Sequence, residues 1–189
     1  MPRGERNWEW RWSGLQTLGP GVGIRFDDVL ADVFDLEPDA FGSLVIEASS
    51  EDVLAMGRIF TSMDGKASGT YGQAVPAERI GDFVAAGERR RILFGTENAE
   101  MRFNVGCQST YEWDEAIHIE LFDAAGNSLE TRTMTLPPWG NDQLNRIFGA
   151  HRPIIGAVDV WTEHFGGMFT CYGSVLDNQT NDPTTIPPQ

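Results

Sequence analysis

Residues 116–136 read Ala-Ile-His-Ile-Glu-Leu-Phe-Asp-Ala-Ala-Gly-Asn-Ser-Leu-Glu-Thr-Arg-Thr-Met-Thr-Leu, and this stretch decides the fold. Apolar and polar residues alternate over 116–122, which is the pattern of a strand with one buried face. A turn follows in which Gly126 can adopt a positive φ. Residues 129–136 then form a second alternating segment. The stretch predicts a β-hairpin that carries His118 on its polar face.

The surrounding sequence extends this pattern to the whole chain. Residues 101–107 predict a further strand ahead of the hairpin, within a strand-rich segment that covers 101–136. The chain has 189 residues, 41% of them hydrophobic, which is enough for a core without metal or disulfide staples. Its 21 Gly and 10 Pro separate short apolar runs, as strands and turns do. We expect an all-β sandwich, with short helical turns at 26–34 and 143–148 where apolar residues recur at helical spacing.

Two parts of the chain share six landmarks in the same order. These are a Thr-Leu-x-Pro segment, an apolar pair ending in Phe, a Gly-led strand, an apolar strand, a polar turn and a closing Pro. The paired segments are 17–20 with 135–138, 33–34 with 147–148, 42–46 with 156–160, 56–60 with 172–176, 62–66 with 177–182, and 74–76 with 185–187. Because their order is kept, we predict an internal duplication with halves 1–100 and 101–189. The first half is an N-terminally incomplete copy, with one strand (7–18) in place of three.

The two cysteines, Cys107 and Cys171, lie in strand-like apolar segments. We expect them on neighbouring strands of the second half, where they form either a disulfide or two buried thiols. A disulfide requires Cα atoms closer than about 7 Å. Their spacing lacks the C-x-x-C pattern of zinc and thioredoxin-type sites.

Charge and hydropathy exclude two partner classes. The formal net charge is −14, so the surface would repel nucleic-acid phosphates and anionic lipids. No apolar run reaches the ~18 residues of a spanning helix. No leader precedes the first strand either, which fits a cytosolic protein or a chain whose leader has been removed.

Residues with catalytic or metal-binding chemistry are few. The three histidines, His118, His151 and His164, have no catalytic or metal-ligand spacing, so we expect no enzymatic activity and no cofactor. Four oxygen-rich residues are the only calcium candidates, and they are Asp177, Asn178, Asn181 and Asp182. Their spacing matches no known calcium loop. We favour a turn whose side chains bond to their own backbone.

Three tryptophans alternate near the N-terminus. Trp8, Trp10 and Trp12 would project from one face of a strand. They would either pack into the sandwich core or form a flat platform for sugar rings, and the core is the better interpretation because large aromatic side chains bury much apolar area.

Two motifs carry a resemblance to a known family. One is Arg-Phe-Asn-Val-Gly at 102–106, and the other is Tyr-Gly-Ser-Val-Leu-Asp-Asn-Gln-Thr-Asn-Asp-Pro at 172–183. Together with 26–30 and 69–73, they resemble an Ig-like or jelly-roll-like β-sandwich module of secreted bacterial proteins, found beside peptidase or adhesin-like domains. The resemblance covers most of 15–188 and implies an extracellular or cell-surface location. It implies no activity.

We therefore expect a non-catalytic extracellular module for binding, structural spacing or assembly. The alternatives are a carbohydrate-binding module that uses the Trp8–Trp12 face, and an accessory domain of a larger secreted enzyme. The expected partner is a protein or a second copy, which docks through the N-terminal strand because a strand-poor first half leaves a sheet edge unpaired. A glycan is the other possible ligand.

Overall fold

The computed structural model describes residues 11–37, 40, 42–62 and 70–189. The chain divides into two compact units, 1–44 and 45–189. In the first unit α1 (Val29–Phe34) begins after Asp28, whose carboxylate accepts the Ala31 N–H at 3.1 Å. This confirms the short helix predicted within 26–34. No helix of the described residues is long and apolar enough to cross a membrane.

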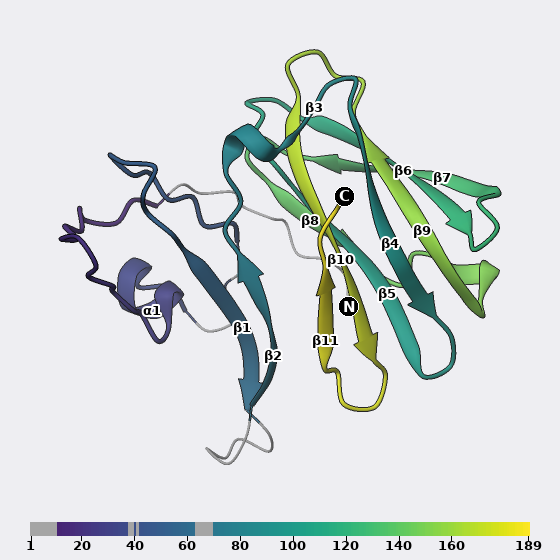
Figure 1. Ribbon diagram of the computed structural model, residues 1–189, viewed down its shortest axis with the longest axis horizontal. Coiled ribbons are helices and arrows are strands. Elements are labelled where there is room, and N and C mark those ends of the chain that lie inside the picture. The colour runs from purple at the N-terminus through teal and green to yellow at the C-terminus, as the bar shows by residue number, and fades with distance from the viewer. Residues whose placement is uncertain (1–10, 38–39, 41, 63–69) are drawn as a thin grey trace. The chain divides into compact units, whose positions relative to one another are not determined.

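The second unit is an antiparallel β-sandwich (Figure 1). One sheet has the strand order β11-β10-β5-β8, with β3 added beside β10, and the other has the order β4-β9-β6-β7. A separate hairpin consists of β1 and β2. The strands are β1 (Met56–Ser62), β2 (Thr70–Pro76), β3 (Val84–Ala85), β4 (Arg89–Glu97), β5 (Met101–Ser109), β6 (Glu115–Asp123), β7 (Ser128–Leu136), β8 (Asn141–Leu144), β9 (Ile154–Trp161), β10 (Met168–Asp177) and β11 (Pro183–Ile186). Single turns of 3-10 helix lie at Ile80–Asp82 and Gly149–His151.

The predicted hairpin is confirmed as β6 and β7. Ile117 lies opposite Met134, and both side chains are buried. His118 lies on the opposite, outer face, as its alternation with Ile117 and Ile119 predicts. β5, however, pairs with β10 and β8 and not with β6. The segment predicted over 101–136 is therefore divided between two sheets.

Three other predicted segments are wrong in the residues that the structure describes. Residues 11–18 and 43–46 form no strand. Residues 143–148 form no helix, because Gln143 and Leu144 belong to β8 and pair with β5. Arg146 then adopts a φ of 51°, which ends any right-handed helical path. Burial of Ile147 and Phe148 comes from this sharp bend and not from a helical face.

The duplication stays a prediction. The compact units divide after Leu44, whereas the predicted halves divide after residue 100. Residue 100 lies between β4 and β5, which belong to the two facing sheets. Thus β4, on the N-terminal side of that division, pairs with β9 and helps to close the same sandwich.

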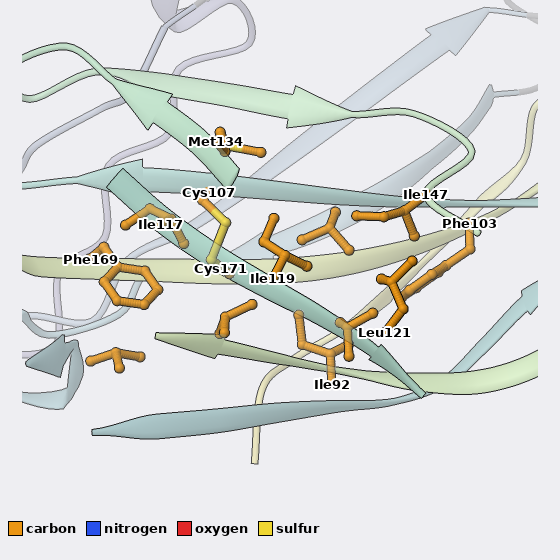
Figure 2. Packing of buried hydrophobic residues seen from close by; sticks show 14 of the residues in the cluster. Ile92, Phe103, Cys107, Ile117, Ile119, Leu121, Met134, Ile147, Phe169 and Cys171 are labelled. Atoms are coloured by element: carbon orange, nitrogen blue, oxygen red, sulfur yellow. A yellow bond between two sulfur atoms is a disulfide. The ribbon is translucent and has the colours of Figure 1, made fainter. Parts of the chain in front are cut away.

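The core lies between the two sheets and includes a disulfide (Figure 2). Cys107 and Cys171 are opposite each other on β5 and β10, with Cα atoms 4.0 Å apart, and their Sγ atoms are bonded. The expectation of neighbouring strands is confirmed. Both cysteines are surrounded by buried apolar side chains, among them Ile117, Met134 and Phe169.

Glycines make room for the largest side chains of the core. The ring of Phe103 stacks against that of Phe148, with centroids 5.8 Å apart. A Cβ atom on Gly95 would lie 2.6 Å from the Phe103 ring, and a Cβ atom on Gly173 would lie 2.7 Å from it. Both distances are closer than van der Waals contact allows, so glycine at these two positions is a packing requirement.

Candidate functional site

Three loops converge at one end of the sandwich. They connect β5 to β6 (110–114), β7 to β8 (137–140), and β9 to β10 (162–167). The Ser109 N–H donates to the Gly140 carbonyl at 2.9 Å, and the Trp139 N–H donates to the Tyr111 carbonyl at 3.0 Å. The Tyr111 hydroxyl donates to the Phe165 carbonyl at 3.3 Å. We call this group of loops the aromatic end, after Tyr111, Trp113, Trp139 and Phe165.

A buried carboxyl group holds the aromatic end from inside. Glu115 is fully buried at the start of β6, and its Oε2 atom accepts a short hydrogen bond from the Ser109 hydroxyl. The same hydroxyl oxygen accepts the Tyr111 N–H at 2.9 Å. Among the residues that the structure describes, none forms a hydrogen bond with Glu115 Oε1. Burial raises the pKa of Glu115 above its usual value, although the Ser109 hydrogen bond and the charge of His164 act against this shift.

The outer surface of the aromatic end combines exposed rings with acidic groups. The exposed fractions of Trp113 and Phe165 are 68% and 92%. Beside them is a shallow depression, which is lined by Asp114, Ala116, His118, Glu163 and His164. The His164 ring meets the edge of the Tyr111 ring at a centroid distance of 4.8 Å. Exposed aromatic groups next to carboxylates are suited to bind a cation, an arginine-rich surface or a sugar.

The outer face of the second sheet carries two arginine–aromatic–carboxylate units. In the first, the Arg89 guanidinium lies 3.7 Å from the centroid of a Trp161 ring and bonds to Glu120 at 3.0 Å. The second consists of Arg91, Phe122 and Asp159, with a ring distance of 4.7 Å and two hydrogen bonds of 2.6 and 2.8 Å. His118 extends the first unit by stacking on Trp161 at 5.3 Å.

The opposite end of the sandwich presents arginines. Arg102 donates to the side-chain oxygens of Asn178 at 3.1 Å and Asn181 at 2.8 Å. Arg146 donates to the same Asn178 oxygen at 3.1 Å. Among the described residues, neither guanidinium forms an ion pair, although Arg102 and Asp177 attract each other electrostatically. We call this surface the arginine end; it unites the two sequence motifs at 102–106 and 172–183.

The four calcium candidates lie in this network. Asp177 accepts the backbone N–H groups of Gln179 at 2.7 Å and Thr180 at 2.8 Å, and it thereby shapes the turn between β10 and β11. The side-chain oxygens of Asn178 and Asn181 accept from arginine. Asp182 joins the turn through its backbone, whose N–H donates to the Thr180 hydroxyl at 3.2 Å. No cluster of three metal-binding side chains occurs in the described part of the chain. These contacts agree with a structural turn, and calcium binding stays untested.

The three N-terminal tryptophans are only partly described. Trp8 and Trp10 lie outside the described residues. Trp12 lies in the first compact unit, is 75% exposed there and belongs to no strand, so both interpretations, core packing and a platform for sugar rings, stay predictions.

Sequence reasoning missed the aromatic end. Trp113 and Trp139 are 26 positions apart in the sequence, and the loops that carry them meet only through the fold. One signal was available, because Glu115 has the same strand parity as Ile117 and Ile119 and therefore points inward. A carboxyl group on the buried face of a strand is unusual, and it marks the position where the loops are anchored.

Comparison with protein-family models, curated proteins and solved structures finds no match for this chain.

Replacing Glu115 with glutamine is expected to flatten the pH dependence of stability. Because the folded state raises the pKa of Glu115, it binds a proton more tightly than the unfolded state. This contribution to stability is present at acid pH and is lost as pH rises from the unfolded value, about 4.3, through the folded value. One proton gives a slope of up to about 1.4 kcal/mol per pH unit. Urea unfolding at a series of pH values measures it.

The control for this experiment is Glu112→Gln, which changes an exposed carboxyl group on the neighbouring loop. It should keep the wild-type slope. Equal slopes for the wild type and Glu115→Gln would show that Glu115 does not carry the pH dependence.

Changes at Asp177 are expected to affect the turn and not calcium binding. The two backbone N–H donors lower the pKa of Asp177, so its contribution to stability is present above the unfolded pKa and is lost as pH falls through the lower, folded value. Asp177→Ala should lower Tm at neutral pH, whereas Asp177→Asn keeps an acceptor oxygen and should lower it less. Millimolar calcium should leave the Tm of all three proteins unchanged. A calcium-dependent rise that Asp177→Ala abolishes would reverse the assignment.

Proposed function

We propose that this chain is a non-catalytic extracellular binding module that engages its partner through the aromatic end. The observation that carries the proposal is the exposure of Trp113 and Phe165 on loops that are anchored from below by buried Glu115. Isolated apolar side chains are common on surfaces. Here two large rings lie on connected loops beside carboxylates, and such amphipathic surfaces are typical of interfaces.

The disulfide supports the extracellular part of the proposal. Cys107 and Cys171 are bonded inside the core, and structural disulfides form and persist mainly in oxidising compartments. The resemblance to secreted β-sandwich modules points to the same location.

The environments of the histidines support a non-catalytic role. His118 stacks on Trp161, and the His164 ring packs on the edge of Tyr111. His151 lies 3.4 Å from Glu130, which is also bonded to Arg132. The Thr133 hydroxyl lies 3.4 Å from His118 Nδ1, but this pair is exposed, and among the described residues no carboxylate bonds to the His118 ring to orient it, as hydrolytic sites of the Ser-His-Asp kind require.

Binding through the aromatic end is tested with Trp113→Ala/Phe165→Ala. The wild type and this variant are applied to a glycan array and to immobilised copies of the chain itself. The matched control is Met56→Ala/Ile59→Ala, because these two side chains are 78% and 66% exposed on the separate β1–β2 hairpin. We expect one class of partner to be bound by the wild type and the control and lost by the variant. Binding that survives in the variant, or no binding to either class, would refute the proposal.

A further inference from the structure

Within this chain, an arginine contacts an aromatic ring and a carboxylate at the same time in two places. The aromatic end exposes rings and carboxylates, and the arginine end exposes arginines. On the outer face of the second sheet, Arg89 lies against an aromatic ring and a carboxylate at once. Arg91 does the same. A guanidinium satisfies both neighbours because its flat face contacts the ring while its N–H groups point outward to the carboxylate.

The aromatic end has the ring and the carboxylate without the arginine. Trp113 and Phe165 are exposed, and among the described residues neither ring has a guanidinium above it. Asp114 and Glu163 line the adjacent depression, and no described arginine forms an ion pair with them. The exposed rings and carboxylates of this surface are therefore suited to bind guanidinium groups.

The arginine end has arginines that, among the described residues, contact no aromatic ring and form no ion pair; Asp177 attracts Arg102 from beyond ion-pair distance. Arg102 and Arg146 converge on the neutral amide oxygen of Asn178, which fixes both guanidinium groups but leaves their positive charges. The Arg146 backbone N–H is also bonded to buried Asn104 at 3.1 Å, which holds the backbone of this exposed residue. Two positive groups held close together in a chain of net charge −14 are suited to bind an anionic surface.

The two surfaces lie at opposite ends of the same strands. Arg102 is near the start of β5 and Ser109 ends it, so about 23 Å separates them at the usual rise of ~3.3 Å per residue. β10 likewise runs from the β9–β10 loop at one end of the sandwich to the β10–β11 turn at the other (Figure 1). One molecule therefore cannot bring its own two ends together.

We propose that the arginine end of one copy of this chain docks on the aromatic end of a second copy. Arg102 and Arg146 of one copy would contact Trp113, Phe165 and the carboxylates of Asp114 and Glu163 of the other. This inference rests on the proposed function, because it names the partner of the aromatic end. The contact joins two different surfaces, so it is heterologous, and each added copy leaves one end of each kind open for another.

The experiment uses two complementary variants of the full chain. The first variant changes the arginine end and is Arg102→Gln/Arg146→Glu. The second changes the carboxylates of the aromatic end and is Asp114→Lys/Glu163→Lys. Sedimentation velocity measures association over a range of concentrations at physiological ionic strength, where the repulsion between distant charges is screened beyond ~8 Å. Glu47→Lys/Asp52→Lys is the control for Asp114→Lys/Glu163→Lys, since it makes the same change in net charge at exposed positions.

We expect the wild type and the control to form oligomers that grow with concentration. Each complementary variant alone should stay monomeric, because each has lost one of the two surfaces. An equimolar mixture of them should form a dimer and stop there, because one intact arginine end meets one intact aromatic end. Arg146→Glu alone repeats the test if the loss of Arg102 unfolds the chain, which far-ultraviolet circular dichroism reveals.

The alternatives give different results. A monomeric wild type at all concentrations would overturn the head-to-tail contact, and glycan binding lost in Trp113→Ala/Phe165→Ala would then still support the proposed function. A variant that dimerises alone would show a symmetric contact through one end. Association retained in both variants and in Trp113→Ala/Phe165→Ala would refute the contact, and, without a glycan signal, the proposed function as well.

Discussion

Replacing Cys107 and Cys171 with alanine is expected to lower the free energy of unfolding by about 4 kcal/mol. The bond joins residues 64 positions apart, so it removes many conformations from the unfolded chain. The chain-entropy relation gives about 3 kcal/mol for a loop of ~15 residues and about 4.7 for ~100, which places this loop near the upper part of the range. Because a domain of this size has about 5–15 kcal/mol of stability in total, the loss is a large fraction of it.

Urea unfolding at equilibrium, with and without a thiol reductant, measures this effect. The wild type in reductant and the double alanine variant should unfold at similar urea concentrations, both well below that of the oxidised wild type. The double variant should not respond to the reductant. An oxidised wild type whose midpoint is unchanged by full reduction would show that the disulfide contributes little to stability.

This result also bears on location. If the reduced chain remains fully folded, the disulfide provides less support for an extracellular module, because folding would not depend on an oxidising compartment. A reduced chain that is largely unfolded at 37 °C would instead link folding directly to such a compartment.

Replacing Phe103 with alanine is expected to cost about 3–5 kcal/mol. Phe103 is fully buried between the sheets and stacks on Phe148. Its removal would leave a cavity that rigid neighbouring strands close only in part, in addition to the lost transfer of the ring from water. Phe103→Leu keeps more of the apolar volume and should cost less.

The close packing of glycine against this ring provides a sharper test. Gly173→Ala should destabilise the wild type by about 1–3 kcal/mol, because the new Cβ atom overlaps the Phe103 ring and an Ile92 methyl group. In the Phe103→Leu background the overlap with the ring is relieved, so the same change should cost less. A double-mutant cycle in urea measures this coupling. Strictly additive losses would show that Gly173 is not there to accommodate the ring.

The alternation of residues determined much of the fold by itself. It located β6 and β7 and placed His118 on the outer face. The helical spacing of apolar residues in 26–34 predicted α1. These features depend on neighbours within a few positions along the chain, where the geometry of a strand or a helix turn is fixed by the backbone.

The same local patterns were ambiguous where tertiary contacts compete with propensity. Residues 143–148 have apolar groups at helical spacing, yet pairing with β5 extends the chain at 143–144. Parity along a strand also tells which face is buried but not which sheet the strand joins. For this reason the segment 101–107 was expected with the hairpin, whereas β5 pairs with β10, whose partner residues follow 60 to 76 positions later.

The candidate site was decided by the tertiary structure. Trp113, Trp139 and Phe165 are separated by about 26 residues at each step along the chain, and they share one end only because antiparallel strands return their loops to it. Strand parity alone predicts that Glu115 points inward. Its hydrogen bond to Ser109 depends on the loop that connects β5 in one sheet to β6 in the facing sheet. The sequence alone determined which side chains lie on a buried face. The packing of the two sheets decided which loops meet, because contacts between distant segments depend on strand order, and strand order is not encoded in the two-residue period of any one strand.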